Sequence, residues 1–344
     1  MTTSSEPLAS GTSVCHLSSV ICHRLVAVFA IVLFCLAVSA QSFPDPPAAV
    51  ITNGMVHAKL LLPDAEKGYY RGTRFDWSGV VSELEYKGHS FCGQWFAKYN
   101  PTTHDAILGP ADAFDPLGYD SIRAGSRFIK IGVGLLETDK AAPYAPFKYY
   151  KVVNGGDWKV EKTENSVRFT QTLTGDSGYA YIYSKEVKLL KGKPVMLLEH
   201  SLKNTGSRTI ETEVFNHNFF VLDKRAAGPG LFLKFPFLLH AEEARGLGQI
   251  ADLRGDSLVM LRAPAGHESV YAIMHGYSDS KKDFHIILKN DSSGAAVQID
   301  GDRPLSKLVC WGSATILCPE PYIHIKVNPG ETFRWAIRYE LQGE

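Results

Sequence analysis

The segment Tyr179-Ala-Tyr-Ile-Tyr-Ser-Lys-Glu-Val-Lys-Leu189 decides the fold class, because its residues alternate in polarity. Successive side chains of an extended strand point to opposite faces. One face then carries Tyr179, Tyr181, Tyr183, Val187 and Leu189, and the other carries Ser184, Glu186 and Lys188. Lys185 is the exception, because it falls on the apolar face. The pattern predicts a β-strand with one buried face.

The residues that follow continue the β pattern. Lys191-Gly-Lys-Pro194 and Asn204-Thr-Gly-Ser207 read as turns that separate the strands 195–203 and 209–222. We expect these strands and 179–189 to form an antiparallel meander, with the third strand carrying His217. At residues 242–247 we expect only a short turn.

The C-terminal region has the same character. Asn328-Pro-Gly-Glu331 is typical of a tight turn, and residues 333–341 then alternate between apolar and polar. Many strands separated by turns predict an all-β fold, a large antiparallel β-sandwich. Because no linker or repeat divides residues 41–344, we expect them to form one domain.

The first forty residues resemble a secretory signal peptide. Arg24 precedes the apolar run Leu25 to Val38, and Val38-Ser39-Ala40 supplies the small residues of a cleavage site. We therefore expect cleavage near Ala40 and export to the periplasm or the medium. An uncleaved membrane anchor is the alternative, but the run is shorter than the roughly 20 residues that a span needs. After cleavage we expect no stable membrane span.

Charge and cysteine content exclude some classes of protein. Lysine plus arginine number 36 and aspartate plus glutamate number 36, so no general attraction to nucleic acid is expected. No Cys-x-x-Cys or His-x-x-x-His spacing predicts a metal site. Cys92, Cys310 and Cys318 follow the leader. They are either one disulfide with a free thiol or three buried thiols, and we prefer the latter.

The segment Glu213-Val-Phe-Asn-His-Asn-Phe-Phe-Val-Leu222 places a titratable imidazole in an apolar run. Strand alternation puts Phe215, His217 and Phe219 on one face and Asn216 on the other. Histidine is the side chain best suited to move a proton near neutral pH. His217 is therefore either a proton donor in a sugar-binding surface or a hydrogen-bonded core histidine.

Glu320 lies between Pro319 and Pro321. Proline gives no N–H to a central ladder, so we expect a strand end, an edge or a bulge here. Pro321 also holds Glu320 extended. The carboxylate is thus either aimed at a ligand or solvated in an edge turn.

A third group of polar and aromatic residues lies near the N-terminus. Arg74 and Asp76 share one face of a short extended segment beside Trp77, and Trp95 and Phe96 follow. They form either a hydrogen-bonding set beside an aromatic platform or an ion pair at the sandwich edge.

Several of these motifs together resemble the galactose mutarotase (aldose 1-epimerase) superfamily. The resemblance rests on two regions, Gly175-Asp-Ser-Gly-Tyr179 through Phe215-Asn-His-Asn-Phe-Phe-Val-Leu222, and Leu317-Cys-Pro-Glu-Pro321 followed by Asn328-Pro-Gly-Glu-Thr-Phe333. The segment Arg71-Gly-Thr-Arg-Phe-Asp-Trp-Ser-Gly79 is similar to the family's opening. The resemblance implies a galactose mutarotase-like supersandwich that binds a small-molecule sugar.

The family's mechanism would assign His217 as general acid and Glu320 as general base. Glu320 would remove the proton of the anomeric hydroxyl while His217 protonates the ring oxygen, and reclosure of the open aldehyde gives the other anomer. No metal or organic cofactor is required. Because acid and base act on two oxygens, we expect them on different strands across a cleft.

The expected substrate-binding residues are Arg74, Asp76, His104, Lys130 and Asn216. The sequence departs from the family in three places. Val221 replaces an asparagine, and no residue matches the family's substrate-binding aspartate. The His-Gly-Gly segment is missing, and its nearest candidates are His104 and the stretch Gly109-Pro-Ala-Asp-Ala-Phe114. The leading expectation is an isomerase acting on sugar anomers. A non-catalytic carbohydrate-binding protein and a polysaccharide lyase- or hydrolase-related domain are the alternatives.

Overall fold

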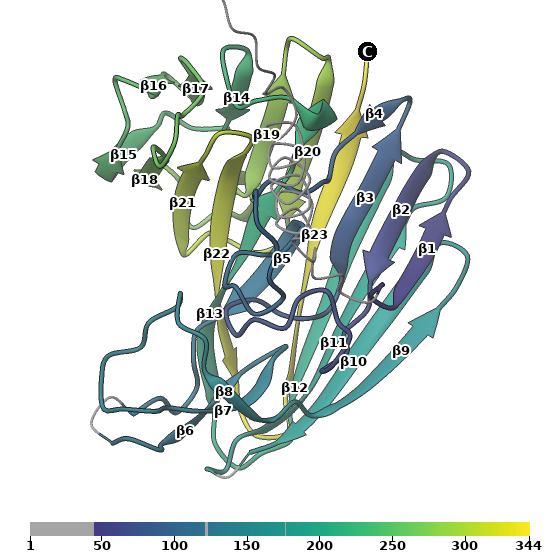
Figure 1. Cartoon of the computed structure of the whole chain (residues 1–344), viewed down its shortest axis with the longest axis vertical. Helices are drawn as coiled ribbons and strands as arrows, with labels where there is room; N and C mark the ends of the chain where they lie inside the picture. Colours follow the sequence, from purple (N-terminus) through teal and green to yellow (C-terminus); the bar gives the residue numbers. More distant parts are fainter. Residues whose placement is uncertain (1–44, 121–122, 176) are drawn as a thin grey trace, which may run out of the picture. The chain divides into compact units, whose positions relative to one another are not determined.

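Two large antiparallel sheets contain most of the strands (Figure 1). The computed structural model describes residues 45–120, 123–175 and 177–344. The expected signal peptide, 1–40, lies outside these residues and stays a prediction. None of the helices in the described part is long and apolar enough to cross a membrane.

The ten-stranded sheet takes strands from both halves of the chain. In spatial order it contains β16 (Ala251–Arg254), β17 (Ser257–Met260), β14 (Leu231–Lys234), β19 (His285–Asn290), β20 (Ala295–Gly301), β23 (Thr332–Gln342), β12 (Val195–Asn204), β11 (Ala180–Leu189), β10 (Ser166–Thr174) and β9 (Asp157–Lys162).

The six-stranded sheet carries His217 and Glu320. Its order is β15 (His240–Arg245), β18 (Val270–His275), β21 (Lys307–Gly312), β22 (Leu317–Val327), β13 (Ile210–Phe219) and β5 (Gly109–Phe114).

Two smaller sheets and two short 3-10 helices complete the secondary structure of the described residues. The smaller sheets are β1 (Ala48–Thr52), β2 (Val56–Leu61), β3 (Val80–Tyr86) and β4 (His89–Ser90), and β6 (Arg127–Lys130), β7 (Gly134–Glu137) and β8 (Lys151–Asn154). The 3-10 helices are η1 (Leu222–Lys224) and η2 (Lys281–Asp283).

The all-β prediction is confirmed, and so is the burial expected from alternation. In β11, Tyr181, Tyr183, Val187 and Leu189 are buried, and in β23 Trp335, Ile337, Tyr339 and Leu341 are buried. The side chains of Asn216 on β13 and Tyr339 on β23 are hydrogen-bonded at 2.7 Å. The six-stranded sheet therefore turns the Asn216 face of β13 toward the ten-stranded sheet.

The expected meander is wrong at its third strand. β11 and β12 are neighbours, but β12 pairs on its other side with β23, and β13 belongs to the six-stranded sheet. The Asn204 amide holds the crossing point, because it donates to Arg208 O at 2.8 Å and to Val327 O, at the end of β22, at 2.8 Å. A short turn was expected at residues 242–247, but residues 240–245 form the irregular edge strand β15.

Candidate active site

His217 and Glu320 lie side by side on adjacent strands of one sheet. The last backbone pair between β13 and β22 is Phe215 with Tyr322. Continuing this register by two residues places His217 opposite Glu320, and His217 Nε2 lies 3.3 Å from Glu320 Oε1. The expectation of two strands across a cleft is therefore corrected to neighbouring strands.

The prolines around Glu320 explain how β22 holds it. β22 is an interior strand of the six-stranded sheet, so the expected strand end or edge is wrong. Its pairing with β21 continues through both prolines, whereas its pairing with β13 stops at Tyr322. Beyond that point the Asn218 amide replaces the ladder by donating to Pro319 O at 2.9 Å. The Asn218 side chain thus joins the two strands beside the His217–Glu320 pair, and the buried Pro319 carbonyl keeps a partner.

Aromatic rings surround the imidazole. The ring of Phe219 stacks on that of His217 with centroids 3.7 Å apart, and the rings of Phe75 and Trp311 meet it edge-on at 5.8 Å. His217 Nδ1 has no hydrogen-bond partner among the described residues. Because the side chains of His217 and Glu320 are 3% and 7% exposed, both groups lie in a nearly dry environment.

Arg74, Asp105 and His104 form a polar chain next to this pair. The Arg74 guanidinium is ion-paired with Asp105, and His104 Nε2 lies 3.2 Å from the other oxygen of Asp105. The Arg74 guanidinium also lies 4.8 Å from the ring centroid of Phe147, a residue that is 60% exposed. His104 contacts the same ring at 5.0 Å. The Arg74 cation, the Asp105 carboxylate and the exposed Phe147 ring therefore lie together at the edge of the site.

Burial shifts the two titratable groups in opposite directions. It raises the pKa of Glu320 to about 7, which Arg74 partly offsets. Burial, reinforced by the positive charge of Arg74, holds the pKa of His217 well below its usual range. Asp105 raises both pKa values. At mildly acidic pH the pair therefore holds one proton, and this proton is found mainly on Glu320.

A surface hollow of about 390 Å³ begins beside the pair. We call it the aromatic hollow, and the residues that matter for its chemistry are Trp95, Phe96, His104, Asp105, His267 and Trp311. Trp311 joins the hollow to His217, and Asp105 joins it to Arg74. Its volume is within the range of about 300–1,000 Å³ that ligand sites occupy.

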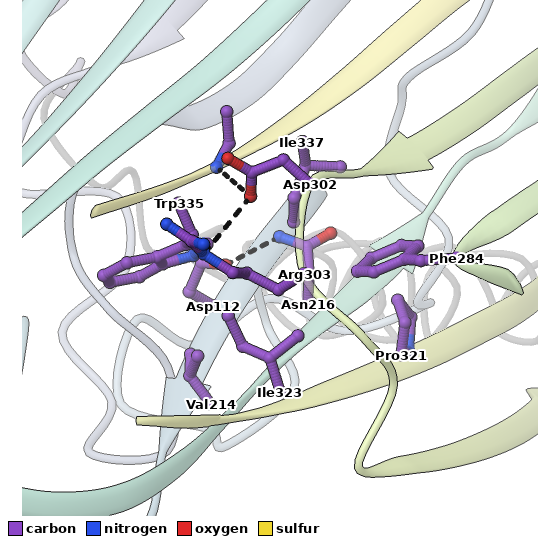
Figure 2. Close-up of a pocket in the computed structure, with 11 residues that line it drawn as sticks. Asp112, Val214, Asn216, Phe284, Asp302, Arg303, Pro321, Ile323, Trp335 and Ile337 are labelled. Carbon is purple, nitrogen blue, oxygen red and sulfur yellow. Dashed lines mark hydrogen bonds and ion pairs between the residues drawn. The ribbon is translucent and has the colours of Figure 1, made fainter. Parts of the chain in front are cut away.

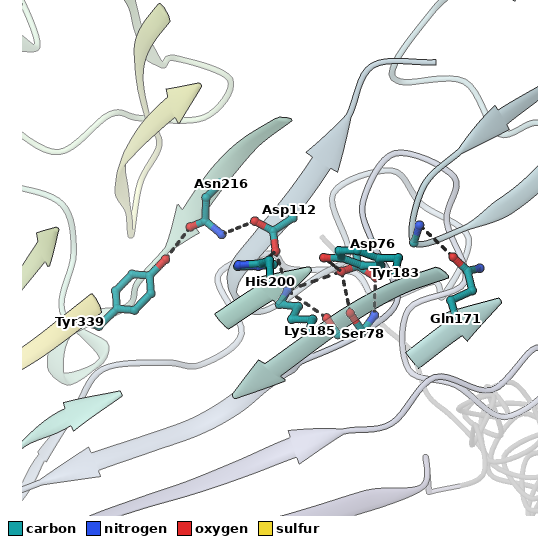
Figure 3. Close-up of polar contacts among 10 residues, drawn as sticks. Asp76, Ser78, Asp112, Gln171, Tyr183, Lys185, His200, Asn216 and Tyr339 are labelled. Atoms are coloured by element: carbon teal, nitrogen blue, oxygen red, sulfur yellow. Dashed lines mark hydrogen bonds and ion pairs between the residues drawn. The ribbon is translucent and has the colours of Figure 1, made fainter. Parts of the chain in front are cut away.

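Asp76 and Asn216 lie in a separate buried network between the sheets (Figure 3). Asp76 accepts hydrogen bonds from Ser78 and Tyr183, and its carboxylate lies 3.6 Å from Lys185 Nζ. Asn216 donates to Asp112 at 2.8 Å. Asn216 lies on the face of β13 opposite to His217, and both Asn216 and Asp76 are buried among interior partners. The structure therefore does not bring these two expected sugar-binding residues to the His217–Glu320 pair.

Asp112 is the centre of this network. Its Oδ2 lies 2.7 Å from Lys185 Nζ and 3.0 Å from His200 Nε2. Burial raises the pKa of Asp112, but Lys185 and His200 outweigh it and hold that pKa well below the usual range. Burial lowers the pKa of Lys185, but the negative charges of Asp112 and Asp76 outweigh this effect and raise that pKa above its ordinary value. The network is thus an interior ion cluster rather than a group of neutral polar residues.

The cavity beside this network is too small for a sugar, because it measures only about 10 Å³. Asp112, Asn216 and Trp335 are among the residues that line it (Figure 2). A space of this size is close to the minimum for one water molecule. The interior network therefore has a structural role, and this cavity on the Asn216 face of β13 cannot hold a sugar.

Lys130 is buried at the end of β6, and its ammonium group donates to Phe114 O. Burial lowers its pKa to about 7, and the negative charge of Asp115 opposes that shift. Its Nζ lies 5.5 Å from the ring centroid of Tyr144. Lys130 therefore joins the end of β6 to the end of β5, and no contact among the described residues links it to the His217–Glu320 pair.

Four of the expected site residues come together, namely His217, Glu320, Arg74 and His104. Trp95 and Phe96 line the hollow as expected. Sequence reasoning missed Asp105, Trp311 and Phe147. Asp105 directly follows His104, so its carboxylate was a detectable signal, whereas Trp311 and Phe147 reach the site only through the fold.

No group of three or more potential ligands in the described residues is arranged to hold a metal ion. Cys92, Cys310 and Cys318 are free and buried.

Solved structures resemble the fold of this chain, although no family model matches the chain and no curated protein matches it. A galactose mutarotase-like protein from Lactobacillus casei is 14% identical, with a TM-score of 0.51, over 86% of this chain and 100% of that chain. The GalM/aldose epimerase homologue from C. elegans is 15% identical, with a TM-score of 0.53, over 86% and 99%. A galactose mutarotase-like protein from Clostridium acetobutylicum is 13% identical, with a TM-score of 0.52, over 87% and 99%. The β-sandwich that holds His217 beside Glu320 is therefore the galactose mutarotase-like fold.

Proposed function

We propose that this protein interconverts the anomers of a reducing sugar by acid–base ring opening, as an aldose 1-epimerase does. The observation that carries the proposal is the 3.3 Å approach of His217 Nε2 to Glu320 Oε1 on a buried aromatic face. Ring opening needs one group to take the proton of the anomeric hydroxyl and another to protonate the ring oxygen. A pair that holds one proton between two sites supplies both groups.

The proton distribution refines how the pair would act. Anionic Glu320 with cationic His217 carries the same number of protons as protonated Glu320 with neutral His217. In the free protein, burial favours the second arrangement. Proton transfer from Glu320 to His217 upon sugar binding then gives the base and acid of the proposed mechanism, without a metal or an organic cofactor.

The surroundings suit a sugar. Trp311 and Phe147 offer apolar ring surface, and His104, Asp105 and Arg74 offer hydrogen-bonding groups at the same edge. An orienting set of a few polar groups on an aromatic lining is the usual composition of a small-molecule site. We further propose that the protein acts outside the cytoplasm, which rests only on the signal-like residues 1–40.

The test is the rate at which freshly dissolved α-glucose or α-galactose reaches its anomeric equilibrium, followed by polarimetry or NMR. The proposal expects a rate proportional to protein concentration. If sugars bind saturably but equilibrate at the buffer rate, the protein is instead a carbohydrate-binding protein. The low exposure of both His217 and Glu320, 3% and 7% for their side chains, is the observation that favours this second candidate.

A further inference from the structure

Two residues that line the aromatic hollow connect it to the His217–Glu320 pair and to Arg74, and we call this part of the lining its inner end. At this end Trp311 meets the His217 ring edge-on at 5.8 Å, and Asp105 is ion-paired with Arg74. Asp105 and Arg74 also influence the pKa values of both His217 and Glu320. Trp311 and Asp105 therefore belong both to the hollow and to the surroundings of the pair.

The hollow is also lined by residues that the proposed reaction does not use, and we call this part of the lining its outer end. Lys98 and His267 line it and are both exposed. Glu268 also lines it, but its two carboxylate oxygens lie 2.6 and 2.9 Å from the Arg262 guanidinium nitrogens. The outer end thus offers hydrogen-bonding side chains without an unpaired carboxylate.

Both walls of the hollow are fixed by bonds of their own. Trp95 Nε1 donates to Ile107 O at 3.0 Å, and Thr315 Oγ1 donates to Trp95 O at 3.2 Å. The segment that carries His267 is closed by the Arg262–Glu268 pair and by the bond from Ala265 N to Glu268 at 2.9 Å. A hollow held in this way exists before a ligand arrives, so binding costs little ordering of the walls.

We infer that the substrate is an oligosaccharide of at least two units, with its reducing-end ring over the His217–Glu320 pair and the next ring in the outer part of the aromatic hollow. This inference rests on the proposed function. It also fixes the direction of the chain, because ring opening requires a free anomeric hydroxyl. The second sugar must therefore be attached through a non-anomeric oxygen of the first and must extend away from the pair.

The experiment compares glucose with maltose, cellobiose and lactose as substrates and as ligands. Anomerisation is followed by NMR, and affinity is measured by calorimetry on the whole chain. The test variants are Lys98→Ala/His267→Ala, which removes the outer polar groups, and Thr103→Trp, which places a bulky ring on the wall of the hollow. The matched controls are Lys191→Ala/His324→Ala and Thr205→Trp, at exposed positions outside the hollow.

At least one disaccharide is expected to show kcat/KM and affinity about tenfold above those of glucose, equivalent to about 1.4 kcal/mol. The ratio of the disaccharide value to the glucose value should fall toward one in both test variants and stay near tenfold in both controls. The inference is overturned if kcat/KM and affinity are equal for glucose and every disaccharide, or if the disaccharide-to-glucose ratio changes in neither test variant. Both outcomes leave the proposed function intact.

If no sugar equilibrates faster than in buffer, the proposed function fails and the affinities decide the inference about the hollow. Tighter binding of a disaccharide that both test variants weaken would then support the two-ring site. Equal affinities for one and two rings would overturn it.

Discussion

Asn218 donates a hydrogen bond to Pro319 O at 2.9 Å, at the point where the backbone ladder between β13 and β22 stops. The bond ties together the residues that directly follow His217 and precede Glu320. A side chain thus holds the two strands in register where the prolines interrupt backbone pairing.

Replacing Asn218→Leu is expected to lower both stability and activity. The buried Pro319 carbonyl would lose a partner, which costs about 1–3 kcal/mol. The 3.3 Å spacing of His217 and Glu320 would also relax, so kcat should fall more than KM changes. Urea unfolding and anomerisation kinetics measure the two effects. Unaltered kcat in a folded Asn218→Leu protein would show that the bond does not position the pair.

The activity is expected to decline as the pH rises through about 7. The pKa of Glu320 is raised to about 7, and that of His217 is well below its usual range, so the one-proton state of the pair is populated below neutrality and lost above it. The pH profile of kcat/KM reports this loss for the free protein. A profile that rises through pH 7 would mean that the pair works only after losing its proton.

Arg74 sets the pH at which the activity declines. Its positive charge lowers the pKa of both Glu320 and His217. In Arg74→Met the falling limb of the kcat/KM profile should therefore move to higher pH, in addition to any loss of sugar binding. Arg74→Lys keeps the charge and serves as the control whose limb stays near that of the unaltered protein.

Glu320→Gln is expected to stabilise the fold at high pH. Because the pKa of Glu320 rises from 4.5 to about 7 on folding, the ionised form costs the native state free energy as the pH rises between these values. The substitution removes that cost, which amounts to about 3 kcal/mol above pH 7 and vanishes below pH 4.5. Urea unfolding at pH 4 and pH 8 measures it, with Glu199→Gln on the exposed side of β12 as the control. An equal effect at both pH values would contradict the raised pKa.

Lys185→Met is expected to destabilise the fold by about 3–5 kcal/mol, because it leaves buried carboxylates without their cation. The Lys185 and Asp112 side chains are 0% and 1% exposed, and their charged atoms lie 2.7 Å apart. Lys191→Met, in an exposed turn, is the control. The double variant Lys185→Met/Asp112→Asn should lose less than the sum of its single variants in urea unfolding. Strict additivity would show that the two groups do not interact.

Acid should weaken the same cluster. The folded-state pKa of Asp112 is held well below its usual range, so its stabilising contribution is complete above the unfolded value of 3.8 and is lost as the pH falls further.

The sequence was most informative where apolar and polar residues alternate with the two-residue period of a strand. Alternation in residues 179–189 and 333–341 correctly predicted the buried faces of β11 and β23. Lys185, the one residue that broke the pattern, proved to be buried with Asp112 and Asp76 rather than turned to solvent. A lysine on an apolar face was therefore a signal for an interior ion cluster, although its partners, more than 70 residues away along the chain, could not be read locally.

Long-range pairing could not be derived from local pattern. The turn at 204–207 predicts a hairpin equally well whether the next strand pairs with β12 or crosses to another sheet. The crossing depends on β23, which takes the place beside β12. The same limit applies to the site: His217 and Glu320 could be chosen by residue type, but their opposition on neighbouring strands follows from the β13–β22 register.

The most direct test of the central claim is the anomerisation rate of α-glucose or α-galactose with the unaltered protein and with His217→Gln and Glu320→Gln. We expect clear acceleration by the unaltered protein and a loss of about 10²–10⁴-fold in each variant, because each removes one proton-transfer group. Both variants should retain the circular dichroism spectrum of the folded protein. Acceleration that survives in both folded variants would contradict the claim that these two residues carry the reaction.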